Sequence, residues 1–155
     1  MAKSDRSATM ARLQSATRFA RTALAARLLD HGFYAGQDQI MLALSQLDGQ
    51  TPGQLAGKLG VRPPTITKTI NRLQAQGVLD KRASEEDARQ AHIFLTERGK
   101  ETIRAIEKCV RKTEKQAFRG MDKKEQKALA RLLARVEGNL SANGAAEIED
   151  DETEE

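Results

Sequence analysis

The feature of this sequence that most constrains its fold is a pair of short helical segments in the middle of the chain. The first is expected to begin at Thr51-Pro52, because a threonine hydroxyl can cap the first free amides and proline fits the first helical position. Gly60 is expected to end it, and Pro63-Pro64 opens a second helix that stops before Gly77. Two such helices joined by a turn of three or four residues are typical of a helix-turn-helix.

The hydrophobic period changes directly after this pair. Residues 78–82 and 91–95 favour extended structure, and the segment 83–90 between them is polar and turn-prone. We therefore expect a β-hairpin with a hydrophilic tip, which would be the wing of a winged helix-turn-helix. The predicted fold class is mainly α with a small β-hairpin wing (α+β).

Further helices are expected on both sides of this module, where apolar side chains recur at helical spacing or a capping residue precedes a helix-forming run. These helices are expected at residues 10–29, 37–47, 97–119 and 123–140. We expect residues 10–141 to form one domain, with the winged helix-turn-helix at about 37–100. Residues 1–9 are expected to be flexible, and the acidic residues 142–155 are expected to be a disordered tail.

Charge is distributed unevenly along the chain. Seven of the 22 acidic residues lie in 147–155, where there is no lysine or arginine, so the net charge of +4 becomes +11 for residues 1–146. A basic body indicates a polyanionic partner, most often nucleic acid, although a soluble lysine-rich surface would have the same composition.

Other features limit the class of protein. No run approaches the roughly 18 apolar residues that a membrane helix needs, and residues 1–9 lack the apolar stretch of a signal peptide. The single cysteine, Cys109, leaves no internal disulfide and fits a reducing compartment. We therefore expect a cytoplasmic protein that is not in the membrane.

The helix that opens at Pro63 has two predicted faces. Ile66, Ile70 and Leu73 fall within one sector and should pack inward. The opposite face carries Pro64, Lys68, Asn71 and Ala75, with Thr67 and Arg72 on its flanks. Six bases against one acid in residues 51–83 favour contact with DNA, the alternative being a solvated helix face.

Two motifs in this region are specific. The helix pair carries Leu55-Ala56, Leu59-Gly60-Val61 and Pro64-Thr65-Ile66-Thr67, and the wing carries Asp87-x-Arg89, five further residues, then Leu95-Thr96 and Gly99. With this spacing the chain resembles the MarR family of bacterial regulators, by motif over about residues 37–100 and by helix order elsewhere. One departure is Ala88, where many members carry a second arginine.

The resemblance implies a homodimer whose N- and C-terminal helices, about 10–30 and 97–140 here, interlock as dimerisation helices. It implies a sequence-specific double-stranded DNA-binding transcription regulator, usually a repressor, on a pseudo-palindromic operator with half-sites about one helical turn apart. The recognition helix would enter the major groove and the wing arginine the minor groove. Many members release DNA when a small anionic or phenolic effector, or an oxidant, acts near the dimer helices.

The expected DNA-binding residues come from the second helix of the pair and from the wing. Asp87 lies two residues before Arg89, so its carboxylate could pair with the guanidinium and fix its direction. The full set is Arg62, Pro64, Thr65, Thr67, Lys68, Asn71, Arg72, Asp87 and Arg89.

Other positions have two interpretations each. Cys109 lies among basic neighbours that would favour a reactive thiolate, or it is a small half-buried helix residue without redox chemistry. His31, Phe33 and Tyr34 could line an effector pocket, while core packing is the other use of Phe33. No ligand spacing, phosphate-binding glycine motif or catalytic triad is recognisable, so we expect no metal, no cofactor and no enzymatic activity.

Two other functions stay open beside a specific regulator. A non-specific architectural DNA-binding protein would also have a basic body, and it would show little preference between specific and random duplexes. A winged-helix protein-interaction module is the third interpretation, against which the cationic face around Lys68 argues.

Overall fold

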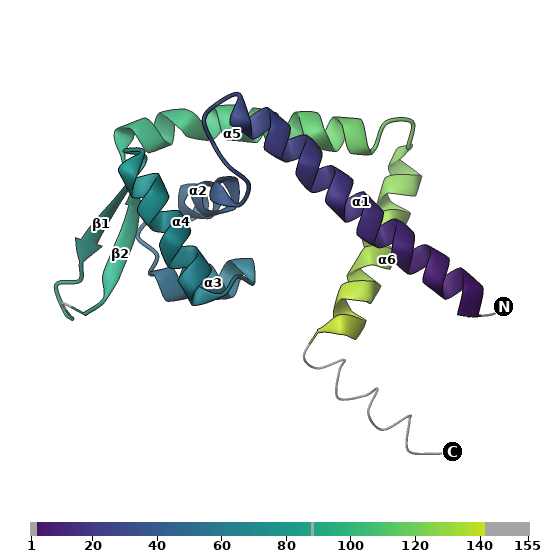
Figure 1. The fold of residues 1–155 in the computed structure, drawn as a ribbon, viewed down its shortest axis with the longest axis horizontal. Coiled ribbons are helices and arrows are strands. Elements are labelled where there is room, and N and C mark those ends of the chain that lie inside the picture. Colours follow the sequence, from purple (N-terminus) through teal and green to yellow (C-terminus); the bar gives the residue numbers. More distant parts are fainter. Residues whose placement is uncertain (1–2, 88, 142–155) are drawn as a thin grey trace, which may run out of the picture. The chain divides into compact units, whose positions relative to one another are not determined.

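The computed structural model of this chain describes residues 3–87 and 89–141. Within them, six helices and one two-stranded antiparallel sheet follow one another (Figure 1). They are α1 (Lys3–Leu29), α2 (Gln37–Gln46), α3 (Pro52–Leu59), α4 (Pro63–Ala75), β1 (Leu79–Ala83), β2 (Ala91–Leu95), α5 (Glu97–Ala117) and α6 (Lys123–Leu140). The expected fold class is confirmed, while the tail expected at 142–155 lies outside the described residues, as does Ala88.

The chain divides between Glu114 and Lys115 into two compact units. In the first unit, α2, α3 and α4 pack on one another and on the hairpin, and the end of α1 and the middle of α5 complete the hydrophobic core. The most deeply buried apolar side chains come from five of these helices and from β2. They are Leu28, Ile40, Met41, Leu44, Leu55, Ile66, Ile70, Leu73, Ile93 and Ile106.

Local sequence features determine where α3 begins and ends and where α4 begins. The Thr51 hydroxyl accepts a bond from the Gln54 amide at 3.1 Å, and the Gln54 side chain accepts from the Thr51 amide at 2.9 Å, which makes a capping box. Gly60 ends α3 in the left-handed conformation at φ 62°, which glycine adopts without steric cost. Pro63 then opens α4, so the turn between the helices has the length expected of a helix-turn-helix.

The hairpin buries one of its two faces. Its strands pair antiparallel, with Leu79 opposite Leu95 and Ala83 opposite Ala91. The strand β1 begins one residue later than expected, because the Val78 amide donates to the Leu73 carbonyl at 3.2 Å in the turn after α4. The face with Leu79, Ile93 and Leu95 packs on the core, and the other face carries Asp80, Arg82, His92 and Phe94.

The segment before α3 lies along the free edge of β2. Ile93 donates to the Gln50 carbonyl at 2.8 Å, and Gly49 donates to the Ile93 carbonyl at 2.9 Å. His92 Nδ1 lies 2.8 Å from the Gly49 carbonyl oxygen, and the buried Gln50 side chain donates to the Leu47 carbonyl at 2.7 Å. The wing is thereby anchored to the end of α2 as well as to α4.

The helix α1 begins at Lys3, earlier than the expected residue 10, so much of the segment expected to be flexible is helical. Residues 3–9 contain no glycine or proline, and Asp5 in the first turn suits the positive end of the helix dipole. At its other end α1 joins the core through Leu28, while Arg27 Nη1 donates to the Thr113 hydroxyl of α5 at 3.1 Å.

The helix α6 belongs to the second unit and begins, as expected, with a cap at Asp122. The Asp122 carboxylate accepts from the Glu125 amide at 2.8 Å, and the Glu125 carboxylate accepts from the Asp122 amide at 2.9 Å. No residue of α6 is buried, and Leu132 and Leu140 are 48% and 68% exposed. None of the helices in residues 3–87 and 89–141 combines the length and apolar character needed to cross a membrane.

Candidate nucleic-acid interface

The helix α4 has two faces of different chemistry. Ile66, Ile70 and Leu73 are at most 1% exposed and belong to the core. Because helical side chains repeat every 3.6 residues, their burial fixes which residues face solvent. The prediction of an inward and an outward face on this helix is confirmed.

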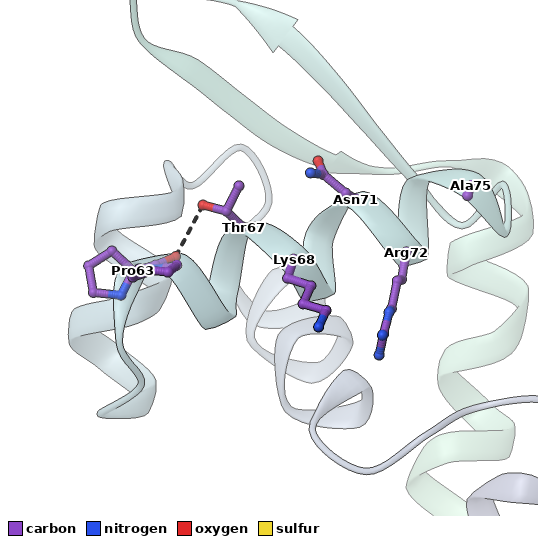
Figure 2. Close-up of a pocket in the computed structure, with 7 residues that line it drawn as sticks. Pro63, Thr67, Lys68, Asn71, Arg72 and Ala75 are labelled. Carbon is purple, nitrogen blue, oxygen red and sulfur yellow. Dashed lines mark hydrogen bonds between the residues drawn. The ribbon is translucent and has the colours of Figure 1, made fainter.

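A shallow recess runs along the outward face of α4 (Figure 2). Lys68, Asn71 and Arg72 supply its polar groups, and small or cyclic side chains fill the rest. All the lining residues belong to this one helix, so the recess is a strip of helix surface and not an enclosed cavity. They are Pro63, Pro64, Thr67, Lys68, Asn71, Arg72 and Ala75, which include every residue that the sequence assigned to the outward face and its flanks.

Two residues of the expected set lie at the start of α4, outside the recess. Arg62 occupies the N-cap position of α4 and Thr65 lies in its first turn, and both are exposed. They extend the polar surface of α4 toward the turn of the helix-turn-helix.

Polar side chains organise the tip of the wing. Ser84 Oγ accepts bonds from the amides of Glu86 and Asp87, and Asp87 Oδ1 accepts from the backbone N–H of Arg89 at 3.0 Å. The prediction that the Asp87 carboxylate could pair with the Arg89 guanidinium is wrong. Within residues 3–87 and 89–141, the ion pairs of the structure are formed by other residues. An aspartate bonds readily to the amide two residues on, so Asp87 shapes the turn that carries the exposed Arg89.

Sequence reasoning missed a stack on the outer face of the hairpin. The Arg82 guanidinium carbon lies 4.5 Å from the centre of the Phe94 ring, and its Nε lies 3.4 Å from Asp80 Oδ2. A Cβ on Gly49 would stand 2.9 Å from the same ring, so Phe94 lies close to Gly49 as well as to the guanidinium. Only strand alternation hints at this contact in the sequence, since it places residues 80, 82 and 94 on one face. The guanidinium of Arg82 is therefore held in one orientation on the outer face of the wing.

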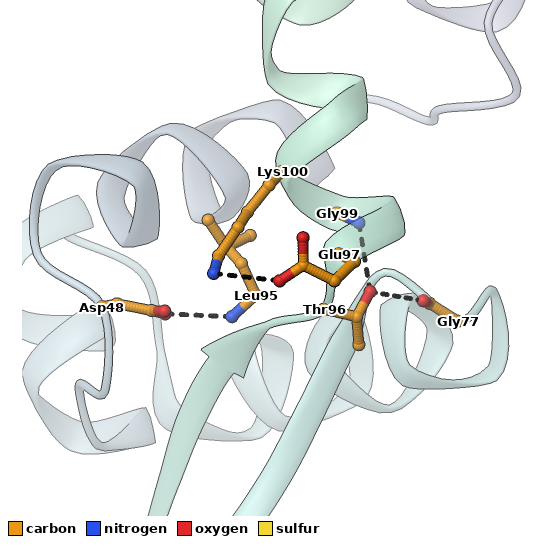
Figure 3. A network of polar contacts seen from close by, with 7 residues as sticks. All are labelled: Asp48, Gly77, Leu95, Thr96, Glu97, Gly99 and Lys100. Carbon is orange, nitrogen blue, oxygen red and sulfur yellow. Dashed lines mark hydrogen bonds and ion pairs between the residues drawn. The ribbon is translucent and has the colours of Figure 1, made fainter.

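The base of the wing is joined to α4 and α5 by Thr96 (Figure 3). The Thr96 hydroxyl donates to the Gly77 carbonyl at 2.7 Å and accepts from the Gly99 amide at 3.1 Å, which caps α5. In the connection between α2 and α3, Asp48 Oδ1 accepts from the Leu95 amide at 2.9 Å. These bonds tie the turn after α4, the end of β2 and the start of α5 to one another.

The glycine of the wing motif permits a close approach of two backbones. A Cβ on Gly99 would overlap the Val78 carbonyl oxygen, which lies in the connection between α4 and β1. The residues Leu95, Thr96 and Gly99 of the motif therefore set the position of the wing relative to α4.

The location of Cys109 supports the structural interpretation of this residue. Its side chain is 4% exposed, and Sγ lies 3.6 Å from the Arg27 carbonyl oxygen of α1. Reactive thiols are typically partly exposed, so a redox role stays a prediction that the burial disfavours. Within the described part of the chain, no three His, Cys, Asp or Glu side chains are grouped so that they could hold a metal ion.

The three residues considered for an effector pocket do not share one environment. Phe33 is 4% exposed and belongs to the core, whereas His31 is exposed and Tyr34 is 60% exposed. Core packing accounts for Phe33, and a pocket at these residues stays a prediction.

A buried carboxylate lies in the first turn of α2. Asp38 is 5% exposed, and burial raises its pKa, while the backbone amides of Asp38, Gln39 and Gly36 lower it to a lesser extent. The neighbouring Gln37 is also buried, and its side-chain oxygen accepts from the Tyr34 amide at 2.9 Å. These groups tie the connection between α1 and α2 to the core.

Known proteins share this architecture. The structure of the transcriptional regulator PA3341 is 29% identical over 85% of this chain and 97% of its own length, with a TM-score of 0.74. The structure of the transcriptional regulator SlyA is 20% identical over 88% of this chain and 96% of its own, with a TM-score of 0.80. A MarR transcriptional regulator from Methanosarcina mazei Go1 is 21% identical over 85% of this chain and 96% of its own, with a TM-score of 0.76.

The model of the MarR family matches residues 34–91, which span α2, the helix-turn-helix and the start of β2. The matched segment contains the outward face of α4 and the turn that carries Arg89. Sequence match, helix order and hairpin agree: residues 34–91 match the MarR family, and the chain has the fold of MarR-family winged helix-turn-helix transcriptional regulators.

Proposed function

We propose that this protein is a sequence-specific regulator that represses transcription by binding a pseudo-palindromic operator in double-stranded DNA. The observation that carries the proposal is the outward face of α4, which presents Lys68, Asn71 and Arg72 while the opposite face is locked in the core. An asparagine amide can bond to the two major-groove atoms of adenine, and cationic side chains can reach guanine or phosphate. A fixed helix holds these groups in register with the bases.

The wing supplies the second contact in this proposal. Arg89 is exposed at the tip, in a turn closed by Asp87, and a planar cation suits the narrow, electronegative minor groove of A·T-rich DNA. Arg89→Ala should weaken binding and reduce the salt slope by about 0.9 per subunit, the value for one phosphate neutralised. Gln90→Ala is the matched control, since Gln90 is the exposed neighbour and carries no charge.

We propose a homodimer as the active unit. Phe19 on α1 is 73% exposed, and Leu132 and Leu140 on α6 are also uncovered in the single chain. Apolar side chains exposed along two helices indicate an interaction surface, and the resemblance assigned these helices to dimerisation. Light scattering at micromolar concentration should return twice the 17.1 kDa of one chain, and a mass of one chain would contradict the dimer.

The decisive experiment is selection of bound sequences from a random duplex pool, followed by titration with the selected duplex and a scrambled copy. The parent protein should prefer the selected duplex by roughly 10³-fold or more. Asn71→Ala should lose about 1–3 kcal/mol of discrimination at particular base pairs, whereas Gln39→Ala, at an exposed amide side chain on α2, should not.

The spacing of the half-sites tests the dimer on DNA. Half-sites read by a two-fold symmetric dimer lie about one helical turn apart. Inserting about five base pairs between them places them on opposite faces of the duplex and should abolish the preference for the selected sequence. Unchanged binding after the insertion would contradict simultaneous contact by two recognition helices.

A non-specific architectural DNA-binding protein is the second candidate, and the net charge of +11 over residues 1–146 favours it. Equal affinity for selected and scrambled duplexes at every salt concentration would support this candidate.

We also propose that a small-molecule effector releases this protein from DNA. This part of the proposal comes from the resemblance to the MarR family. Small anionic and phenolic compounds should be screened for release of the selected duplex from a protein that stays folded. If no such compound releases the protein from DNA, the proposed response to an anionic or phenolic effector is wrong.

A further inference from the structure

We propose that Thr67 contributes to operator specificity through its methyl group, which would contact the 5-methyl group of a thymine in the major groove. This inference rests on the proposed function, because it names the base chemistry that one residue of the outward face of α4 reads. Threonine is usually regarded as a polar residue in a recognition helix, so the assignment depends on where its hydroxyl points.

The hydroxyl of Thr67 is engaged within the helix. Thr67 Oγ1 donates to the carbonyl oxygen of Pro63, one turn earlier, at 3.1 Å (Figure 2). Such bonds select one of the rotamers that a β-branched side chain can adopt in a helix. The hydroxyl proton is therefore used within α4, and it is not available to a base acceptor while this bond persists.

The same rotamer turns the methyl group of Thr67 away from the bonded carbonyl. In Figure 2 the Thr67 oxygen points back toward Pro63, and the methyl carbon projects from the helix on the same side as the Asn71 amide. Thr67 is exposed and lines the recess, so its methyl group is accessible to a partner. Its contribution to that surface is apolar.

Thymine is the base that suits an apolar group in the major groove. Thymine alone presents a methyl group there, while the other bases present hydrogen-bond donors and acceptors. Contact between two methyl groups removes apolar surface from water, and this gain is absent for cytosine, adenine or guanine. The neighbouring Pro64 and Ala75 are also small or apolar, so α4 can approach the base edges closely at this face.

The position of Asn71 locates the expected thymine. Thr67 and Asn71 are four residues apart, which places them about one helical turn, or roughly 6 Å, apart along α4. Base pairs are stacked about 3.4 Å apart. The thymine should therefore lie within about two base pairs of the pair that Asn71 contacts.

The test removes one methyl group from the DNA without changing any hydrogen-bonding atom. Each thymine of the selected duplex is replaced in turn by deoxyuridine, and the affinity of the parent protein is measured by fluorescence anisotropy. At one thymine in each half-site the affinity should fall about fourfold, the effect expected for one buried methyl group. All other thymines in the major-groove contact region should be less sensitive.

Variants at position 67 assign the effect to Thr67. Thr67→Ser keeps the hydroxyl and lacks the methyl, so it should bind the thymine and deoxyuridine duplexes equally at that position. Thr67→Val keeps the outward methyl and lacks the hydroxyl, so it should retain the preference for thymine. The opposite pattern, with preference kept by serine and lost by valine, would show that the hydroxyl reads the base and would overturn the proposal.

Thr69 provides a matched control on the same helix. Its hydroxyl also donates to the carbonyl one turn earlier, that of Thr65 at 2.9 Å, but Thr69 lies about 200° around the axis from Thr67 and is half-buried. Thr69→Ser should leave the thymine preference of the parent unchanged, and loss of the preference in this variant would attribute it to helix structure and overturn the role of Thr67.

Two results with the parent and the serine variant would also overturn the proposal. One is that no single deoxyuridine weakens binding by the parent protein, and the other is that the sensitive thymine remains equally sensitive in Thr67→Ser. In both cases the parent would still prefer the selected duplex over the scrambled one, so the proposed function would stand. If the parent shows no such preference, the proposed function itself has failed.

Discussion

Replacement of Gly99 by alanine should destabilise the protein, although alanine is the better helix former. Gly99 lies in the first turn of α5, and an alanine Cβ would overlap the Val78 carbonyl oxygen and stand 3.4 Å from Leu95 Cδ2. That carbonyl accepts a bond from the Thr96 amide at 3.1 Å, so it cannot move away without weakening the contact at the base of the wing.

The magnitude follows from three effects. Relieving the overlap should cost about 1–3 kcal/mol, the range for an added group in a packed site. Weakening the bond between Thr96 and Val78 adds about 0.5–1.5 kcal/mol. The helix preference of alanine over glycine returns about 0.5–1 kcal/mol. Taken together, these effects should lower the free energy of unfolding of Gly99→Ala by about 0.5–4 kcal/mol, with about 2 kcal/mol at the centre of the range.

The assay is urea unfolding followed by far-ultraviolet circular dichroism at one fixed protein concentration, because the stability of the proposed dimer would depend on concentration. Gly57→Ala is the matched control. Gly57 is exposed within α3, and a Cβ built there has no neighbouring atom within 4 Å, so alanine should stabilise by about 0.5–1 kcal/mol.

A second measurement connects Gly99 to function. At a temperature where Gly99→Ala is folded, its affinity for the selected duplex should fall, since the wing would shift relative to α4. The reasoning is refuted if Gly99→Ala is as stable as the parent, or if it gains as much as Gly57→Ala. Either result would mean that α5 does not pack closely on the connection between α4 and β1.

Three other perturbations follow from the structure. Burial raises the folded-state pKa of Asp38, so ionising this carboxyl group destabilises the folded protein. The parent should therefore lose stability relative to Asp38→Asn as pH rises from about 4 toward 7. A difference in urea unfolding that does not change with pH would contradict this. Arg82→Gln should weaken binding to selected and scrambled duplexes alike and lower the salt slope, because Phe94 and Asp80 hold the Arg82 guanidinium where it could contact a phosphate. An unchanged salt slope would exclude this phosphate contact. A chain ending at residue 141 should bind DNA more tightly at low salt, because it lacks the seven carboxylates of residues 147–155, and equal affinity would show that they do not compete.

The limits of most elements can be predicted from the sequence because their signals are local. The caps at Thr51 and Asp122 bond to residues three positions on, and Pro63 acts through its own ring. The division of α4 into two faces follows from the helical period alone. The helix α1 starts earlier than the sequence predicts, because residues 3–9 contain no strong cap and helix propensity is a weak signal.

The arrangement of the candidate interface depends on contacts between residues that are distant in the chain. The bond from Leu95 to Asp48 joins residues 47 positions apart, and the contact between His92 and Gly49 joins residues 43 positions apart. No periodicity specifies such partners, because they depend on which segments meet when the core closes. The sequence therefore predicts a recognition helix and a wing, whereas the folded chain determines how Thr96 and Gly99 hold the wing against that helix and how Arg82 stacks on Phe94.

The fold also determines which of two nearby groups a side chain bonds to. Asp87 could bond either the guanidinium or the amide of Arg89, and the geometry of the hairpin tip places the amide 3.0 Å from its carboxylate. In the same way, the threonine at position 67 could present a hydroxyl or a methyl group, and the Pro63 carbonyl takes the hydroxyl. Both outcomes depend on backbone dihedral angles and rotamers, which a residue type restricts without specifying, so they become defined only when the surrounding helix or turn has formed.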